Sequence, residues 1–452
     1  LAESDDSRPC GVRDAKAGLI RFRLQVEFFA GSIAIRMGGG RLAVGLTGLT
    51  VIFAPIFLAM HSVYSMNVID HLLWTMAAYL LVCVIRDGED TGSRRRSWLL
   101  LGVVMGLGCL NKIGMLWFGG GLGVSLLLTD LRRQLRTPWP WLAGGLGLLG
   151  LLPFVLWNAA HDWAHIEFIR NASQHKYAGL TPLAFLAGPV LIQPPLFLPL
   201  WLGGLCFLLC AKRAAPFRPL GIVFVTVAAI LIVNGHSKAE YLASAFPMIY
   251  AAGGVGFESL TALRLRRLRP LVIAIVIVGG LFLLPMAAPV LPVPDFVSYS
   301  AWLGVTHQNS ESKDMGVLPQ FFADMHGWKE MAGDVQEVFS SLSPEEQATA
   351  VVFARNYGQA GAIEYFCPRP LSERVIAVHN NYWIWGYPDA VGTIIVIGGE
   401  EQDHGARCDN LRPAGIVHHP YSMPYENNLT IWICRGLHGP LSGIWREEKH
   451  FM

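Results

Sequence analysis

Hydrophobic and polar positions divide the chain into two parts. Residues 21–291 are apolar stretches joined by short loops, whereas residues 292–452 alternate short apolar runs with polar segments. A bilayer core about 30 Å thick needs roughly 20 apolar residues per helix. We therefore expect a polytopic α-helical membrane protein of about ten spans, followed by a small α/β extramembrane domain. The expected spans are 21–37, 41–63, 68–86, 97–111, 113–129, 140–157, 183–210, 219–234, 243–260 and 271–291.

The span 183–210 differs from the others because it contains several prolines. Proline removes a backbone donor, so a helix at this depth must have the freed carbonyls satisfied by neighbouring helices. We expect a kinked or broken helix. The prolines are Pro189, Pro194, Pro195 and Pro199.

Composition agrees with a membrane body, since the chain is 53% hydrophobic and 15% charged, against about 25% charged residues in soluble domains. The net charge of +2 gives no indication of nucleic-acid binding. Basic residues gather in every second loop, and the positive-inside rule places those loops in the cytoplasm. The clusters are Arg86 with Arg94, Arg95 and Arg96; Arg132, Arg133 and Arg136; Lys212, Arg213 and Arg218; and Arg264, Arg266, Arg267 and Arg269.

The same rule places the intervening loops and residues 292–452 outside the cytoplasm. Residues 1–20 also fall outside, and this polar segment has no interpretable pattern and no signal-peptide core. A polar start outside the membrane predicts that a preceding span is missing from the sequence.

Unusual residues gather in these outer loops. Asn67 and Asp70 lie at the membrane boundary, where Asp70 either complements the helix macrodipole or has a functional role. Lys112 lies in a tight turn between two apolar spans, as a snorkelling lysine or as a phosphate-binding cation.

The loop 158–182 has the aromatic and polar pattern of an interfacial helix. His161 and His165 have a spacing that could hold a metal, but no third ligand is in view, so no metal site and no cofactor are predicted. In the loop 235–247, Lys238, Glu240 and Tyr241 are suited to a lipid-linked phosphate, or Lys238 and Glu240 form a weak surface pair.

The C-terminal domain contains the strand-like runs 349–355, 374–378, 392–399 and 430–436, and the helical runs 327–342 and 359–366 separate some of them. This alternation predicts a small α/β domain. Cys367, Cys408 and Cys434 allow at most one disulfide plus a free thiol there. The Gly-containing run 397–405 lacks a nucleotide-binding fingerprint, and the aromatic run 379–389 suits a core or a sugar-stacking face.

Several segments resemble the bacterial protein mannosyltransferase-like glycosyltransferases, polytopic enzymes of the GT-C class that include the lipid A aminoarabinose transferases. The most specific are Asn-Lys-x-Gly-Met at 111–115 and the LWNA-x-HDW pattern at 156–163. The other matching segments are 58–81, 98–119, 138–173, 237–254, 356–366, 379–386 and 423–427.

The resemblance implies transfer of a sugar from a polyprenyl phosphate to a lipid, glycan or protein acceptor, on the periplasmic face of a bacterial inner membrane. The donor phosphate needs cations, for which Lys112 and Lys238 are the local candidates, and His161, Asn67, Glu240 and Tyr241 complete the expected substrate contacts. We expect the C-terminal domain to contact the acceptor.

The acceptor hydroxyl needs a carboxylate base within hydrogen-bond reach. In the family that carboxylate lies in an acidic motif of the first external loop, which this sequence does not show. Asp70 and Asp162 are the candidate substitutes. Two alternatives stay open: a transporter or flippase, which predicts charges within the spans and internal repeats, and a non-catalytic scaffold derived from such an enzyme.

Overall fold

The computed structural model describes residues 10–87, 91–177, 179–193, 196–262, 265–305 and 314–452. The chain forms two compact units. The helical unit comprises Leu1–His161 and Gly179–Phe296, and the sheet unit comprises Asp162–Ala178 and Val297–Met452. The second half of the chain divides between Phe296 and Val297, and the segment Asp162–Ala178 belongs to the sheet unit.

The helical unit has a helix at the place of each predicted span. Its helices are α1 (Cys10–Arg36), α2 (Arg41–Phe53), α3 (Pro55–Met60), α4 (Met66–Arg86), α5 (Thr91–Asn111), α6 (Met115–Leu128), α7 (Trp139–Ala160), α9 (Pro182–Ile192), α10 (Leu198–Cys210), α11 (Arg218–Asn234), α12 (Phe246–Leu260) and α13 (Leu268–Ala287). Short helical turns join them: η1 (Asp130–Arg136), η3 (Lys212–Phe217) and η4 (Ala239–Ala245).

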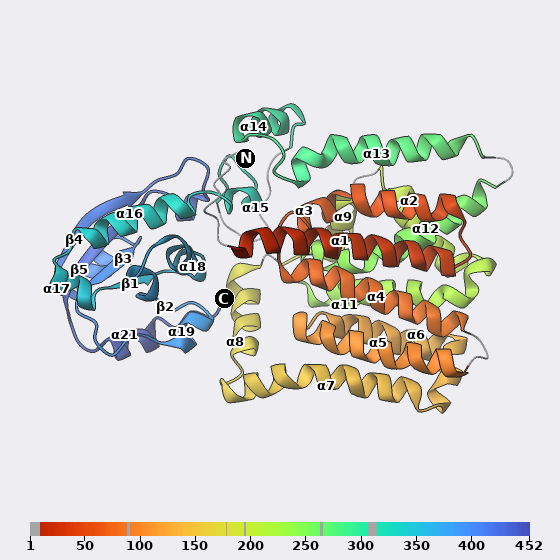
Figure 1. Ribbon diagram of the computed structural model, residues 1–452, viewed down its shortest axis with the longest axis horizontal. Helices are drawn as coiled ribbons and strands as arrows, with labels where there is room; N and C mark the ends of the chain where they lie inside the picture. The colour runs from red at the N-terminus through yellow and green to blue at the C-terminus, as the bar shows by residue number, and fades with distance from the viewer. Residues whose placement is uncertain (1–9, 88–90, 178, 194–195, 263–264, 306–313) are drawn as a thin grey trace. The chain divides into compact units, whose positions relative to one another are not determined.

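By length and composition, four segments of the described chain are able to cross a membrane: Met66–Arg86, Trp139–Ala160, Lys212–Asn234 and Leu268–Ala287. Arg41–Phe53, Met115–Leu128 and Leu198–Cys210 are shorter apolar helices. Figure 1 shows the end of α4, the start of α5, the α6–α7 connection and the start of α13 at one end of the helical unit. These parts carry residues of three of the basic clusters.

Prolines break two of the predicted spans. The stretch 183–210 divides into α9 and α10, as its prolines predict, although Pro194, Pro195 and also Arg264 lie outside the described residues. The expectation of one continuous helix over 41–63 is wrong, because Ala54 is extended at ψ 124° and separates α2 from α3. Proline disfavours the helical conformation in the residue before it, and Pro55 follows Ala54.

Small residues hold α5 and α7 against each other. A Cβ added to Gly102 would lie 2.5 Å from the Ala143 carbonyl oxygen, and one added to Gly150 would overlap the backbone of Gly106. Such close backbone approach is typical of helix pairs in membranes, where packing replaces the hydrophobic driving force.

The sheet unit contains a five-stranded sheet in the order β2-β1-β3-β5-β4. Its strands are β1 (Val351–Ala354), β2 (Val375–Ala377), β3 (Ile394–Ile397), β4 (Cys408–Val417) and β5 (Leu429–Leu437). Strand β1 pairs in parallel with β2 and β3, whereas β5 pairs antiparallel with β3 and β4.

Helices cover both faces of this sheet (Figure 1). Helices α16 (Trp328–Ser340) and α18 (Tyr357–Phe366) bury one apolar face, and residues of α19 (Asn381–Trp385) and α21 (Leu441–Glu447) pack on the other. The remaining elements of the chain's second half are α14 (Val293–Trp302), α15 (Gln320–Ala323), α17 (Pro344–Thr349), η5 (Leu371–Glu373), α20 (Glu401–Gly405) and η6 (Pro424–Glu426). Helix α8 (Ala164–Asn171) and η2 (Ala172–Lys176) belong to the sheet unit.

The sequence predicts four of the five strands and misses β4. This strand lies at the sheet edge, and most of its residues are exposed or half-buried, so no apolar alternation marks it. Cys408 of β4 forms a disulfide with Cys434 of β5, while Cys367 is a buried free thiol. One disulfide and one free thiol are the combination that the three cysteines allow.

We predict that Gly150→Ala lowers the stability of the helical unit by about 1–3 kcal/mol, because the new methyl group overpacks the α5–α7 contact. The measurement is the thermal unfolding midpoint of the full chain in detergent. Gly144→Ala on the same helix is the matched control, since a Cβ there meets no atom within 4 Å. Equal midpoints for the two variants would contradict the close packing.

Candidate functional site

The start of α4 places two of the predicted residues. Ser65 caps the helix, and its hydroxyl accepts a hydrogen bond from the backbone N–H of Asn67 at 3.3 Å. Asp70 follows one turn later with an exposed fraction of 4%. Ser244 Oγ donates a hydrogen bond of 2.6 Å to Asp70 Oδ2, whereas Asp70 Oδ1 is buried without a hydrogen-bond partner among the described residues.

Lys112 lies in the turn between α5 and α6 and reaches the start of α4. Its Nζ donates a hydrogen bond of 2.9 Å to Asn67 Oδ1 and lies 5.1 Å from the centre of the Tyr241 ring. The neighbouring Asn111 Nδ2 donates to the carbonyl oxygen of Met66 at 2.9 Å. Two hydrogen bonds and a cation–π contact therefore fix the α5–α6 turn against α4 and η4.

The turn η4 supplies the third side of this arrangement. Lys238 precedes it as the N-cap, and Glu240, Tyr241 and Ser244 lie within it. Its residues from Leu242 to Ala245 are buried, whereas Lys238, Glu240 and Tyr241 are half-buried. We call Asn67, Asp70, Lys112, Tyr241 and Ser244 the lysine–aspartate cluster.

The electrostatics of Lys112 reflect its position. Burial lowers the pKa of the Lys112 ammonium, while the carboxylates of Asp70 and Glu240 act in the opposite direction. Lys112 is thus a half-buried cation under the influence of two carboxylates, Asp70 of the cluster and the neighbouring Glu240. Such a cation, held by an amide and an aromatic ring, is able to bind an anionic group.

Sequence reasoning missed a histidine pair beside the cluster. His61 Nε2 lies 2.9 Å from His71 Nδ1, and both rings are buried. The ring of Phe57 packs 5.1 Å from that of His71. In the sequence, both histidines lie at the edges of neighbouring apolar stretches, which was the one signal that could have indicated the pair. The sequence does not show that the two rings come into contact. Sequence reasoning also missed Ser244, because a serine in a small-residue run carries no functional signal.

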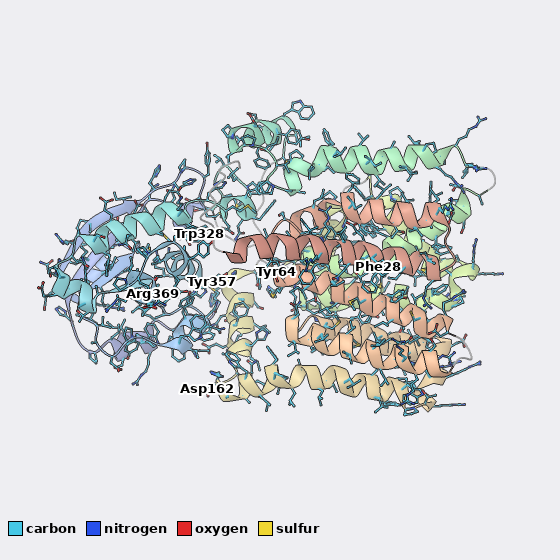
Figure 2. The ribbon with its side chains drawn as sticks, viewed as in Figure 1. Phe28, Tyr64, Asp162, Trp328, Tyr357 and Arg369 are labelled. Atoms are coloured by element: carbon cyan, nitrogen blue, oxygen red, sulfur yellow. A yellow bond between two sulfur atoms is a disulfide. The ribbon has the colours of Figure 1, made fainter. Side chains whose placement is uncertain are left out.

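His161 and Asp162 lie at the end of α7. The His161 ring stacks on Trp157 at 4.4 Å, and its Nδ1 lies 2.7 Å from the Trp157 carbonyl oxygen. Asp162 is exposed, with a left-handed φ of 51°, at the turn from α7 into α8 (Figure 2). Within the described residues, no group of three or more His, Cys, Asp or Glu side chains could hold a metal ion.

Part of the chain resembles a known protein family. Residues 36–157 match the model of the dolichyl-phosphate-mannose-protein mannosyltransferase family. This range contains Asn67, Asp70 and Lys112. No curated protein matches the chain significantly.

The fold matches solved structures over nearly the whole chain. Crystal structures of ArnT from Cupriavidus metallidurans match in two states. The complex with undecaprenyl phosphate has a TM-score of 0.59 and 16% identity over 94% of this chain and 85% of that one. The apo state has a TM-score of 0.56 and 17% identity over 92% and 84%.

The predicted resemblance to the mannosyltransferase-like GT-C glycosyltransferases is therefore confirmed. The chain has an ArnT-like fold, in which apolar helices are followed by a small sheet domain. The family match over residues 36–157 and the apolar helices together support a membrane-embedded protein.

We predict that Ser244→Ala lowers the stability of the chain by about 1–3 kcal/mol, because it leaves both oxygens of the buried Asp70 without a hydrogen bond. The measurement is thermal unfolding in detergent. Ser125→Ala is the matched control, since its hydroxyl is also buried but bonds to Leu122 of its own helix. A loss no larger than that of the control would show that the Ser244–Asp70 bond is dispensable.

Proposed function

We propose that this protein transfers a sugar from a polyprenyl-phosphate donor to a lipid, glycan or protein acceptor, on the periplasmic face of a bacterial inner membrane. The observation that carries the proposal is the position of Lys112. Its ammonium is fixed on a turn between two apolar helices, where a phosphate at the membrane surface would meet it. The complex of ArnT with undecaprenyl phosphate supports the choice of donor.

In this mechanism Lys112 binds the donor phosphate. Negative charge grows on the phosphate as the bond to the sugar breaks, and a cation held in place stabilises that charge without reorganising. Asn67 and Tyr241 hold the ammonium through the hydrogen bond and the ring contact described above. Lys238, at the start of the turn that carries Tyr241, is the second candidate for a phosphate contact.

Asp70 acts in this scheme as a positioning residue. Its carboxylate is buried, is bound by Ser244 and opposes the lowering of the Lys112 pKa. It therefore helps to keep Lys112 charged and ties η4 to α4. The exposed Asp162 stays the second carboxylate that the sequence predicts as a base, and His161 and Glu240 stay candidates for substrate contacts.

We predict that Lys112→Met lowers kcat/KM for sugar transfer about 100-fold, because the charge developing on the leaving phosphate loses its cation. The assay follows labelled sugar from an undecaprenyl-phosphate donor in membranes that contain the full chain. Lys212→Met is the matched control, since Lys212 is an exposed lysine on η3, between other helices.

Transfer that is equal in both lysine variants would reject the role of Lys112. Absence of transfer by the unmodified chain, across several donor sugars and acceptors, would reject the enzyme in favour of the scaffold. Accumulation of a solute or lipid on the opposite membrane face, without any transfer, would instead favour the transporter.

We predict that Asp70→Asn raises KM for the donor several-fold and changes kcat less, because it weakens the field that keeps Lys112 charged. Steady-state kinetics with varied donor separates the two constants. If kcat falls alone while KM is unchanged, Asp70 is the base and the positioning role is wrong. Asp162→Asn, measured in parallel, tests the other carboxylate, for which loss of kcat with unchanged donor KM is the signature of a base.

A further inference from the structure

A cavity with a volume of about 600 Å³ lies within the sheet unit. Its floor is the sheet face formed by Phe353, Ile394 and Val396, and Leu441 and Ile444 of α21 line its other side. A cavity of a few hundred Å³ with apolar walls and a few polar groups has the dimensions of a small-molecule site.

The cavity lies at a special position of the sheet topology. Strands β2 and β3 flank β1 in parallel, and the chain passes from β1 to β2 and then across to the other side of β1. This makes β1 the strand at which the connections change direction. In open parallel sheets, ligands bind beyond the carboxyl ends of the strands at such a point. Arg355 directly follows β1, and Gly398 and Gly399 directly follow β3.

The two glycines let the loop after β3 approach Arg355 closely. Gly398 and Gly399 have positive φ values of 75° and 81°, which favour glycine. A Cβ on Gly398 would lie 3.2 Å from Arg355 Nη1, and one on Gly399 would overlap His404 Nε2. His404 Nε2 in turn lies 2.9 Å from the Gly398 carbonyl oxygen. The Gly-containing run 397–405 therefore shapes the rim of the cavity.

Arg355 is a cation on this rim without an ion-pair partner among the described residues. Within the described residues its guanidinium makes no hydrogen bond or ion pair, although its backbone N–H donates to Gln359. Of the other charged groups of the lining, Arg407 is ion-paired, whereas Asp403 is hydrogen-bonded but keeps its negative charge. Arg407 pairs with Glu448 at 2.7 Å, and Asp403 accepts from the backbone N–H of Glu400 at 2.8 Å.

A smaller cavity of about 240 Å³ in the same unit shares Arg355 and His450 with the larger one. Its lining includes Lys176, whereas its acidic residue Glu426 accepts hydrogen bonds of 2.7 Å from Asn356 and Gln359. The lining of this second cavity therefore contains two basic residues, Lys176 and Arg355, and one acidic residue, Glu426.

We propose that the larger cavity binds an amphipathic anion, with a compact apolar group on the sheet floor and a phosphate or carboxylate paired with Arg355. The planar guanidinium forms two parallel hydrogen bonds with either oxyanion. The floor residues supply the apolar contact, and the absence of a competing ion pair among the described residues leaves Arg355 available. This assignment does not depend on sugar transfer and stands or fails separately from it.

Calorimetric titration of the full chain in nanodiscs tests the proposal, with empty nanodiscs as the reference for partition into lipid. The probes are 2-naphthyl phosphate, 2-naphthoate, neutral 2-naphthol and inorganic phosphate. We expect saturable binding of one or both anionic naphthyl compounds, at least about tenfold tighter than that of either naphthol or inorganic phosphate. Only the anionic naphthyl compounds contact the apolar floor and pair with Arg355 at the same time.

Two variants locate the binding. Arg355→Gln should weaken binding of the anionic probes at least about tenfold and leave binding of naphthol unchanged. The side chain of Arg355 is exposed, so the substitution leaves the core of the sheet unit intact. Ile444→Trp fills the cavity and should abolish binding of all naphthyl probes. Arg446→Gln, an exposed arginine on the same helix outside the lining, is the matched control and should change nothing.

The proposal is overturned if neither anionic probe binds more than it partitions into empty nanodiscs. It is also overturned if Arg355→Gln and Arg446→Gln bind the anions equally. Tighter binding of the phosphate than of the carboxylate would identify a phosphate ester as the ligand, and the reverse order would identify a carboxylate.

Discussion

The contact between Lys112 and the start of α4 is the interaction on which the helical unit's candidate site depends. A charge removed from water is costly unless it is paired and hydrogen-bonded. Lys112 meets this condition through Asn67, Tyr241 and the nearby carboxylates. The same contacts bring together a helix start, a tight turn and η4, which are far apart in the sequence. The contacts that stabilise the charge of Lys112 are therefore the same contacts that would hold it in place for the proposed reaction.

The close packing of α5 on α7 helps to hold the turn that carries Lys112. Lys112 follows directly from α5, so the position of its turn depends on how that helix is held. Gly102, Gly106 and Gly150 allow the two backbones to touch, which limits sliding of α5 along its neighbour. A rigid support of this kind is what a preorganised cation needs, since a displaced charge stabilises a transition state poorly.

In the sheet unit, the pairing of the strands determines where the polar residues lie. Its parallel strands are buried on both faces, and the residues with polar chemistry lie where those strands end. Arg355 and the glycine pair at 398–399 are neighbours because β1 and β3 are adjacent in the sheet. The rim of the cavity is therefore built from residues that are far apart in the sequence. The buried core of the sheet unit is a separate cluster from that of the helical unit.

Particular residues show how far sequence reasoning reached. Lys112, Asn67 and Tyr241 were recognised because polar residues at the ends of apolar stretches are conspicuous, and the structure brings them into contact. Ser244 and the His61–His71 pair were missed, since their significance lies in partners 174 and 10 residues away. Strand β4 was missed because an exposed edge strand lacks the alternation that marks its neighbours.

The sequence by itself determined where the apolar helices lie, that prolines interrupt the stretch 183–210, and that the C-terminal part is a small α/β domain. These features follow from local composition and periodicity, which act over a few turns or strands. Tertiary structure alone decided that Asp70 is bound by Ser244, that Lys112 reaches Asn67, and that Arg355 faces the glycine loop after β3. Such contacts depend on which helices and strands become neighbours, and residue spacing along the chain does not specify this.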